Sequence, residues 1–108
     1  MKVAIVKYNA GNVCSVSYAL QRIGINPIVT DNSEELFSAD KVIFPGVGEA
    51  SSAMHYLQSR NLDQLLISLR QPVLGICLGM QLMCSFSEEN STNCLGIFYE
   101  KVRLFETP

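Results

Sequence analysis

Short apolar runs alternate along this chain with amphipathic stretches, and that alternation indicates strands separated by helices. The runs are rich in β-branched residues and end in loops, whereas the stretches repeat apolar residues every three or four positions. The predicted strands cover residues 2–7, 26–30, 41–44 and 72–76. The predicted helices cover residues 13–23, 33–36, 49–59, 62–70 and 78–86.

Local signals fix several of these boundaries. Asn12 is expected to cap the helix whose apolar face is Val13, Val16, Leu20 and Ile23, and Gly24 is expected to end that helix. The run at 72–76 is wholly apolar, which predicts a strand buried on both faces. A polar loop is expected at 87–93, followed by further strands at 95–98 and 101–105.

Four strand and helix alternations with short connections predict right-handed crossovers and a doubly wound, mainly parallel α/β sheet. The chain has 108 residues, which is one domain or part of a larger one. Its apolar fraction of 48% is enough for a core.

Charge and cysteine content narrow the classes of partner and compartment. The formal net charge is -2 with no basic run, so no nucleic-acid partner is expected. The longest uncharged window, 71–87, is interrupted by proline and glycine and is too short to cross a membrane, and no export signal is expected. Four cysteines without a C-x-x-C pair indicate free thiols in a reducing cytoplasm, and neither a metal nor a cofactor is expected.

The candidate chemistry lies at Gly75-Ile-Cys77-Leu-Gly79, which has the form of a tight turn between a strand and a helix. Such a turn lifts Cys77 above the sheet at the start of a helix, where peptide dipoles favour the thiolate. Cys77 is then a nucleophile. The alternative is that Cys77 is a small buried apolar residue.

A thiolate that attacks an acyl group needs N–H donors for the oxyanion. The backbone N–H of Leu78 is the natural first donor. The loop Pro45-Gly-Val-Gly48 follows the third strand and is expected to lie beside the cysteine turn, where it can supply a second donor. The alternative interpretation of this loop is an ordinary tight turn.

Taken together, Pro45-Gly-Val-Gly48 and Gly75-Ile-Cys-Leu-Gly-Met-Gln81 resemble the triad (class I) glutamine amidotransferases, whose fold is flavodoxin-like. Within that family, the loop from Tyr8 to Asn12 and Ser87-Glu-Glu89 look most like the glutaminase subunits of imidazole glycerol phosphate synthases. The resemblance implies glutamine hydrolysis through a cysteine thioester. It also implies a heterodimer with a (β/α)₈-barrel cyclase, which uses the ammonia in histidine biosynthesis.

The resemblance also assigns roles to single residues. Cys77 would be the nucleophile; Val47 or Gly48, with Leu78, would form the oxyanion hole; and Gly48, Gln81 and Glu89 would bind glutamine. An amide and a carboxylate suit the charged groups of an amino acid. Without the resemblance, Gln81 is a polar helix position and Glu89 a solvated loop charge. Residues 8–12 would lie near the cyclase.

One part of the family pattern is missing here. The family carries a His-x-Glu element downstream of the cysteine, but the one histidine, His55, lies upstream of Cys77. We therefore interpret residues 1–108 as the N-terminal half of one glutamine amidotransferase domain. This half alone is expected to show negligible turnover, and it is expected to associate with further copies of itself. The alternatives are a thiol protein of the wider superfamily, such as a peptidase-like one, or a non-catalytic partner-binding fragment.

Overall fold

Four parallel strands form the central sheet, in the spatial order β2-β1-β3-β4. The computed structural model describes residues 1–10 and 12–105. The strands are β1 (Val3–Val6), β2 (Ile28–Thr30), β3 (Lys41–Phe44) and β4 (Val73–Gly75). In the register of β3 and β4, Phe44 lies opposite Gly75, so the loops that follow these two strands are neighbours.

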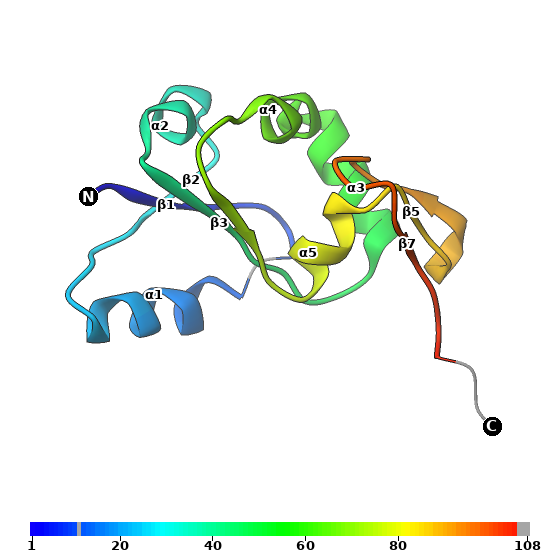
Figure 1. The fold of residues 1–108 in the computed structure, drawn as a ribbon, viewed down its shortest axis with the longest axis horizontal. Helices are drawn as coiled ribbons and strands as arrows, with labels where there is room; N and C mark the ends of the chain where they lie inside the picture. Colours follow the sequence, from blue (N-terminus) through cyan, green and yellow to red (C-terminus); the bar gives the residue numbers. More distant parts are fainter. Residues whose placement is uncertain (11, 106–108) are drawn as a thin grey trace.

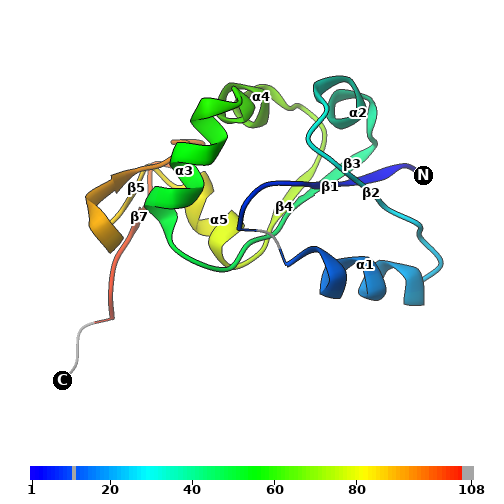
Figure 2. The ribbon, with the colours of Figure 1, turned by 180° about the vertical axis from the view of Figure 1, so that it is seen from behind.

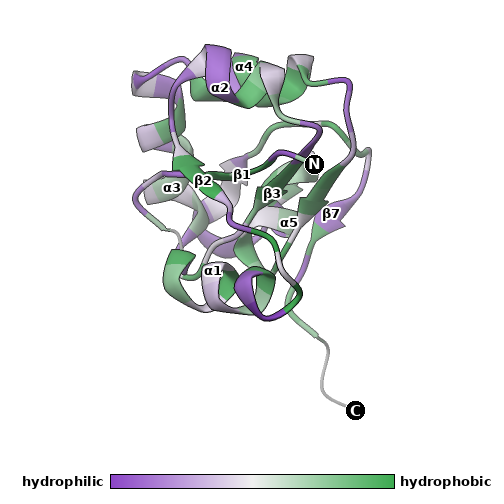
Figure 3. Ribbon diagram, turned by 90° about the vertical axis from the view of Figure 1, so that its left-hand side faces the viewer, coloured by the Kyte–Doolittle hydropathy of each residue, from purple (hydrophilic) through white to green (hydrophobic). Residues whose placement is uncertain are grey.

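Helices cover both faces of this sheet, which confirms the predicted doubly wound α/β fold (Figure 1). Helix α1 lies on one face, while α2, α3, α4 and α5 lie on the other; Figure 3 shows the sheet between α1 and the pair α2 and α4. The helices are α1 (Val13–Arg22), α2 (Ser33–Ser38), α3 (Ala50–Ser59), α4 (Leu62–Ser68) and α5 (Leu78–Met83).

The two faces of the sheet carry cores of very different size. The larger core contains Phe44, Leu57 and Leu82, which are almost completely buried between the sheet and the helices α2 to α5. The smaller core is Val3, Ile5 and Ile43, packed against partly buried side chains of α1. Helix α1 contributes no fully buried residue.

Two expectations about burial are wrong. Ile23 was assigned to the apolar face of α1, but it caps the helix and its side chain is 71% exposed. Strand β4 was expected to be buried on both faces, but Leu74 is 59% exposed. The strand β4 lies at the edge of the sheet, and an open hollow lies between Leu74 and α1.

Helix starts also differ in detail. Asn12 precedes α1 as predicted, but its side chain makes no capping bond and instead accepts a hydrogen bond from Ser15 Oγ at 3.3 Å. Gly24 ends α1 as predicted, with φ +85° in the left-handed region. Glu49 is the cap of α3 and not its first helical residue. Within residues 1–10 and 12–105, no helix is long and apolar enough to cross a membrane.

A second, three-stranded sheet packs beside α3, as Figure 2 shows from behind. It is made of β5 (Phe86–Ser87), β6 (Thr92–Asn93) and β7 (Lys101–Val102), with the 3₁₀ helix η1 (Glu89–Ser91) between β5 and β6. The predicted loop at 87–93 is therefore partly strand and helix. The last predicted strand is shorter than 101–105.

The helix predicted to reach residue 86 ends at Met83, and the strand predicted at 95–98 is absent from the described chain. The two differences have one cause. The N–H groups of Leu95, Gly96 and Phe98 donate to the carbonyls of Leu82, Cys84 and Met83 at 2.8–3.0 Å. This segment therefore satisfies the carbonyls left free at the end of α5 instead of joining a sheet.

Candidate functional site

Cys77 occupies a strained turn between β4 and α5, as the glycine spacing predicted. Its backbone angles are φ 51° and ψ -117°, and the residue is exposed. A Cβ on Gly79 would come within 1.8 Å of the Phe44 carbonyl oxygen, and one on Gly75 within 2.8 Å of the Met80 Cα. The two glycines thus let helix, strand and neighbouring loop pack closely around the cysteine.

The glycine loop after β3 packs directly against this turn. The Leu78 N–H donates to the Gly46 carbonyl at 3.1 Å, and a Cβ on Gly46 would lie 3.2 Å from the Leu78 Cβ. The Val47 N–H donates to the Ala10 carbonyl at 2.6 Å, and Gly48 has φ +120°. The structure therefore brings the loop and the turn together, with the N–H groups of Val47 and Leu78 bonded within the protein.

Tyr8 supports the glycine loop through a buried hydrogen bond, a role that the sequence did not indicate. Its side chain is buried, its hydroxyl donates to the Pro45 carbonyl at 2.5 Å, and its ring lies 5.1 Å from that of Phe44. Burial raises the pKa of the Tyr8 phenol well above its ordinary value, so the hydroxyl remains a donor. Of the segment expected near a cyclase, Tyr8 is thus a core residue, and residue 11 lies outside the described residues.

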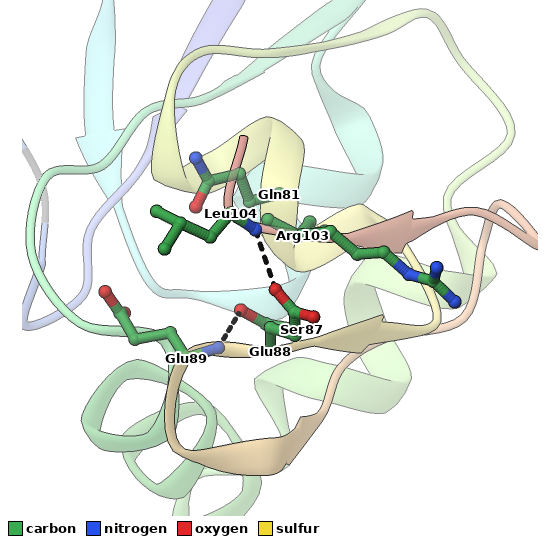
Figure 4. Close-up of a pocket in the computed structure, with 7 residues that line it drawn as sticks. Gln81, Ser87, Glu88, Glu89, Arg103 and Leu104 are labelled. Carbon is green, nitrogen blue, oxygen red and sulfur yellow. Dashed lines mark hydrogen bonds between the residues drawn. The ribbon is translucent and has the colours of Figure 1, made fainter. Parts of the chain in front are cut away.

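Gln81 and Glu89 line one open cavity of about 460 Å³ (Figure 4). Gln81 comes from α5 and Glu89 from η1, and their side chains reach the cavity from different walls. Glu88 closes a third side, because its carboxylate accepts from the Leu104 N–H at 2.7 Å. The other lining residues are Ser87, Val102, Arg103 and Leu104. Cys77 does not line the cavity but lies one helical turn before Gln81, whose N–H donates to the Cys77 carbonyl.

Glu49 is a second residue that sequence reasoning missed. Its carboxylate caps α3 by accepting from the N–H groups of Ser51 and Ser52 at 2.8 and 3.0 Å. Hydrogen bonds from the Ser51 hydroxyl, and then from Asn90 and Ser52, hold the pKa of Glu49 well below its ordinary value. The acidic residue just after the glycine loop was the available signal, since acidic residues favour helix N-termini.

The remaining reactive side chains lie apart from this cavity. His55 is exposed on α3, in a different hollow that also contains Tyr56 and Arg60. Burial raises the pKa of the thiols of Cys84 and Cys94, whereas Cys14 is exposed on α1. Across the described part of the chain, no three His, Cys, Asp or Glu side chains are grouped to hold a metal ion.

A parallel sheet in which a glycine-flanked turn joins a strand to a helix, beside a second glycine loop, is typical of a class of α/β enzymes. Within that class, the chain belongs to the family described as glutamine amidotransferase class-I, which it matches over residues 5–101. That match includes both the glycine loop and the cysteine turn.

The relatives point to one branch of this family. A Bacteroides fragilis protein named imidazole glycerol phosphate synthase subunit HisH is 60% identical over 105 residues, which cover 97% of this chain and 54% of that protein. Proteins of the same name from Bacteroides thetaiotaomicron and Idiomarina loihiensis are 60% and 47% identical, again over 97% and 95% of this chain. The chain spans about half the length of these curated relatives.

Proposed function

We propose that the whole protein hydrolyses glutamine to glutamate and ammonia through a thioester on Cys77. The thiolate attacks the carboxamide carbon, the tetrahedral intermediate expels ammonia, and water then releases glutamate from the thioester. The observation that carries this proposal is the exposed, strained Cys77 one helical turn from Gln81, in a family that acts on glutamine.

Gln81 and Glu89 are the proposed binding groups for the charged end of glutamine. A carboxylate only accepts hydrogen bonds, so Glu89 suits the ammonium group, while the Gln81 amide can donate to the carboxylate. Val47, Gly48 and Leu78 are the proposed oxyanion donors. The N–H groups of Val47 and Leu78 now donate to the carbonyls of Ala10 and Gly46, so they must exchange these partners before they can bind an oxyanion.

The names of the relatives support a more specific role. We propose that residues 1–108 are the N-terminal half of one glutaminase domain, which acts in the cytoplasm with a (β/α)₈-barrel cyclase subunit. The cyclase would use the ammonia to make imidazole glycerol phosphate in histidine biosynthesis. Because His55 lies on α3 in a separate hollow, we propose that the base which activates Cys77 is not supplied by residues 1–108.

A labelling experiment on the whole protein tests the substrate. A chloroketone analogue of glutamine should alkylate Cys77, and glutamine should slow this reaction, as followed by mass spectrometry. The substitution Glu89→Gln should weaken the protection by about tenfold, since a charged hydrogen bond is lost. Cys14→Ser is the matched control, because it removes the other exposed thiol without touching the site.

The alternatives give different results in the same assay. A peptidase-like thiol protein would react at Cys77 without protection by glutamine. A non-catalytic binding fragment would capture a cyclase subunit but give no protected labelling. The 108-residue chain alone should show negligible glutamine hydrolysis, and turnover that disappears in Cys77→Ser would contradict the proposed division of the domain.

A further inference from the structure

Two hydrogen bonds fasten η1 to the start of α3. The side-chain amide of Asn90 donates to Glu49 Oε1 at 2.7 Å, and the backbone N–H of Ala50 donates to Glu89 Oε1 at 3.0 Å. Adjacent residues 49 and 50 thus bind adjacent residues 90 and 89. This crossed pair joins segments that lie about forty positions apart in the chain.

Each member of this arrangement is itself fixed. Both carboxylate oxygens of Glu49 are held by N–H groups of α3, so the acceptor for Asn90 cannot turn away without uncapping the helix. Asn90 has φ 54° and ψ 27°, a left-handed conformation that asparagine adopts more readily than most residues. Because its pKa lies below the ordinary value, Glu49 also remains an ionised acceptor in mildly acidic solution.

Of the four residues joined in this way, only Glu89 lines the cavity with Gln81. One oxygen of its carboxylate is occupied by the Ala50 N–H. The other, Oε2, has no hydrogen-bond partner among residues 1–10 and 12–105 and remains available to a ligand. A glutamate side chain on an exposed turn that no hydrogen bond holds in place loses considerable rotamer freedom when it binds a ligand.

We propose that Glu49 and Asn90 are positioning residues, which fix η1 so that Glu89 presents a free carboxylate oxygen to the ammonium group of glutamine. This inference rests on the proposed function. It adds that the affinity for glutamine depends on two residues that do not line the cavity. The physical reason is that the ordering of Glu89 takes place during folding and not during binding.

The test uses substitutions that spare the backbone of the whole protein. Asn90→Gly keeps the left-handed conformation and removes only the amide. Glu49→Asp keeps a carboxylate that can cap α3 but is one methylene too short to reach Asn90. Ser91→Gly is the matched control, because Ser91 also has positive φ, 45°, in the same turn and its side chain makes no hydrogen bond to α3 among the described residues.

Three measurements separate positioning from general damage. Asn90→Gly and Glu49→Asp should each weaken glutamine binding by about fivefold to tenfold and speed hydrogen exchange of the Ala50 amide by a similar factor. The rate at which iodoacetamide alkylates Cys77 should not change, since the cysteine turn is untouched. The double variant should bind glutamine no more weakly than either single variant, because both substitutions break the same hydrogen bond.

Normal glutamine binding in Asn90→Gly, or an Ala50 amide that stays as protected as in the parent protein, would overturn the inference. So would equal losses in Ser91→Gly, which would show that any change in this turn is harmful. A parent protein that binds no glutamine would defeat the proposed function, and with it the role of Glu89 as a ligand. The Ala50 exchange data would still report separately whether Asn90 holds Glu89.

Discussion

At the scale of single residues, Cys77 carries its thiol in a backbone conformation that favours glycine. Its φ of 51° and ψ of -117° are strained for any residue with a Cβ, at a cost of about 1–3 kcal/mol. We expect Cys77→Gly to raise the free energy of unfolding by about 1 kcal/mol relative to Cys77→Ala, which removes the thiol but keeps the Cβ. Urea denaturation at pH 7 measures the difference, and equal stabilities would mean that the turn is relaxed.

The same scale shows which residues the sequence could reveal. Gly75, Cys77 and Gly79 were recognised because the turn requires them within five consecutive positions. Tyr8 was missed, since its partner Pro45 lies far along the chain. For Glu49 the capping role had a local signal, but its bond to Asn90 had none, because the two residues lie 41 positions apart. No local pattern distinguishes a tyrosine that supports a loop from one that merely fills the core.

At the scale of elements, the cap of α3 makes stability depend on pH. The pKa of Glu49 is lower in the folded chain than its ordinary value of 4.5, so ionised Glu49 stabilises the fold above that value and the contribution is lost as the pH falls. We expect Glu49→Gln to lower the free energy of unfolding at pH 7. The difference from the parent chain should shrink progressively below pH 4.5.

Urea denaturation between pH 7 and pH 3 measures this dependence. Glu34→Gln is a suitable control, because it neutralises an exposed carboxylate in the first turn of α2 and leaves the α3 cap intact. A stability difference for Glu49→Gln that stays constant across this range would contradict the interpretation. It would show that the carboxylate contributes by contact and not by charge.

Elements differ in how well the sequence predicts them. The strands β1 to β4 and their helices were found because hydrophobic periodicity acts over neighbouring residues. After α5, the predicted strand at 101–105 overlaps β7, but β5 and β6 were not predicted. The strand β5 has only two residues, and its partners include Lys101, fifteen positions beyond Phe86. Residues 95–98 have the composition of a strand but are held by the end of α5, and only the tertiary structure shows that preference.

At the scale of the whole molecule, the sheet is unequally covered. Two adjoining hollows lie beside α1, and both are lined by Leu20, Ile43 and Leu74. They run along β4, whose outer edge has no neighbouring strand among the described residues. An unpaired edge next to exposed apolar side chains favours pairing with another chain. A second copy of this 108-residue chain carries the same unpaired edge and the same apolar side chains, so it provides a chemically matching surface.

Self-association of the chain should therefore depend on Leu74. We expect the parent chain to form dimers or larger species whose mass rises with concentration, and Leu74→Lys to be monomeric, because a charge at this edge opposes pairing. Phe37→Lys is the matched control, since Phe37 is exposed to a similar extent, 53% against 59%, but belongs to α2 on the other face. Sedimentation velocity over a concentration series measures the mass. A monomeric parent chain would exclude the contact. The same loss of association in Phe37→Lys would place the contact elsewhere, because only a contact through β4 makes the two variants differ.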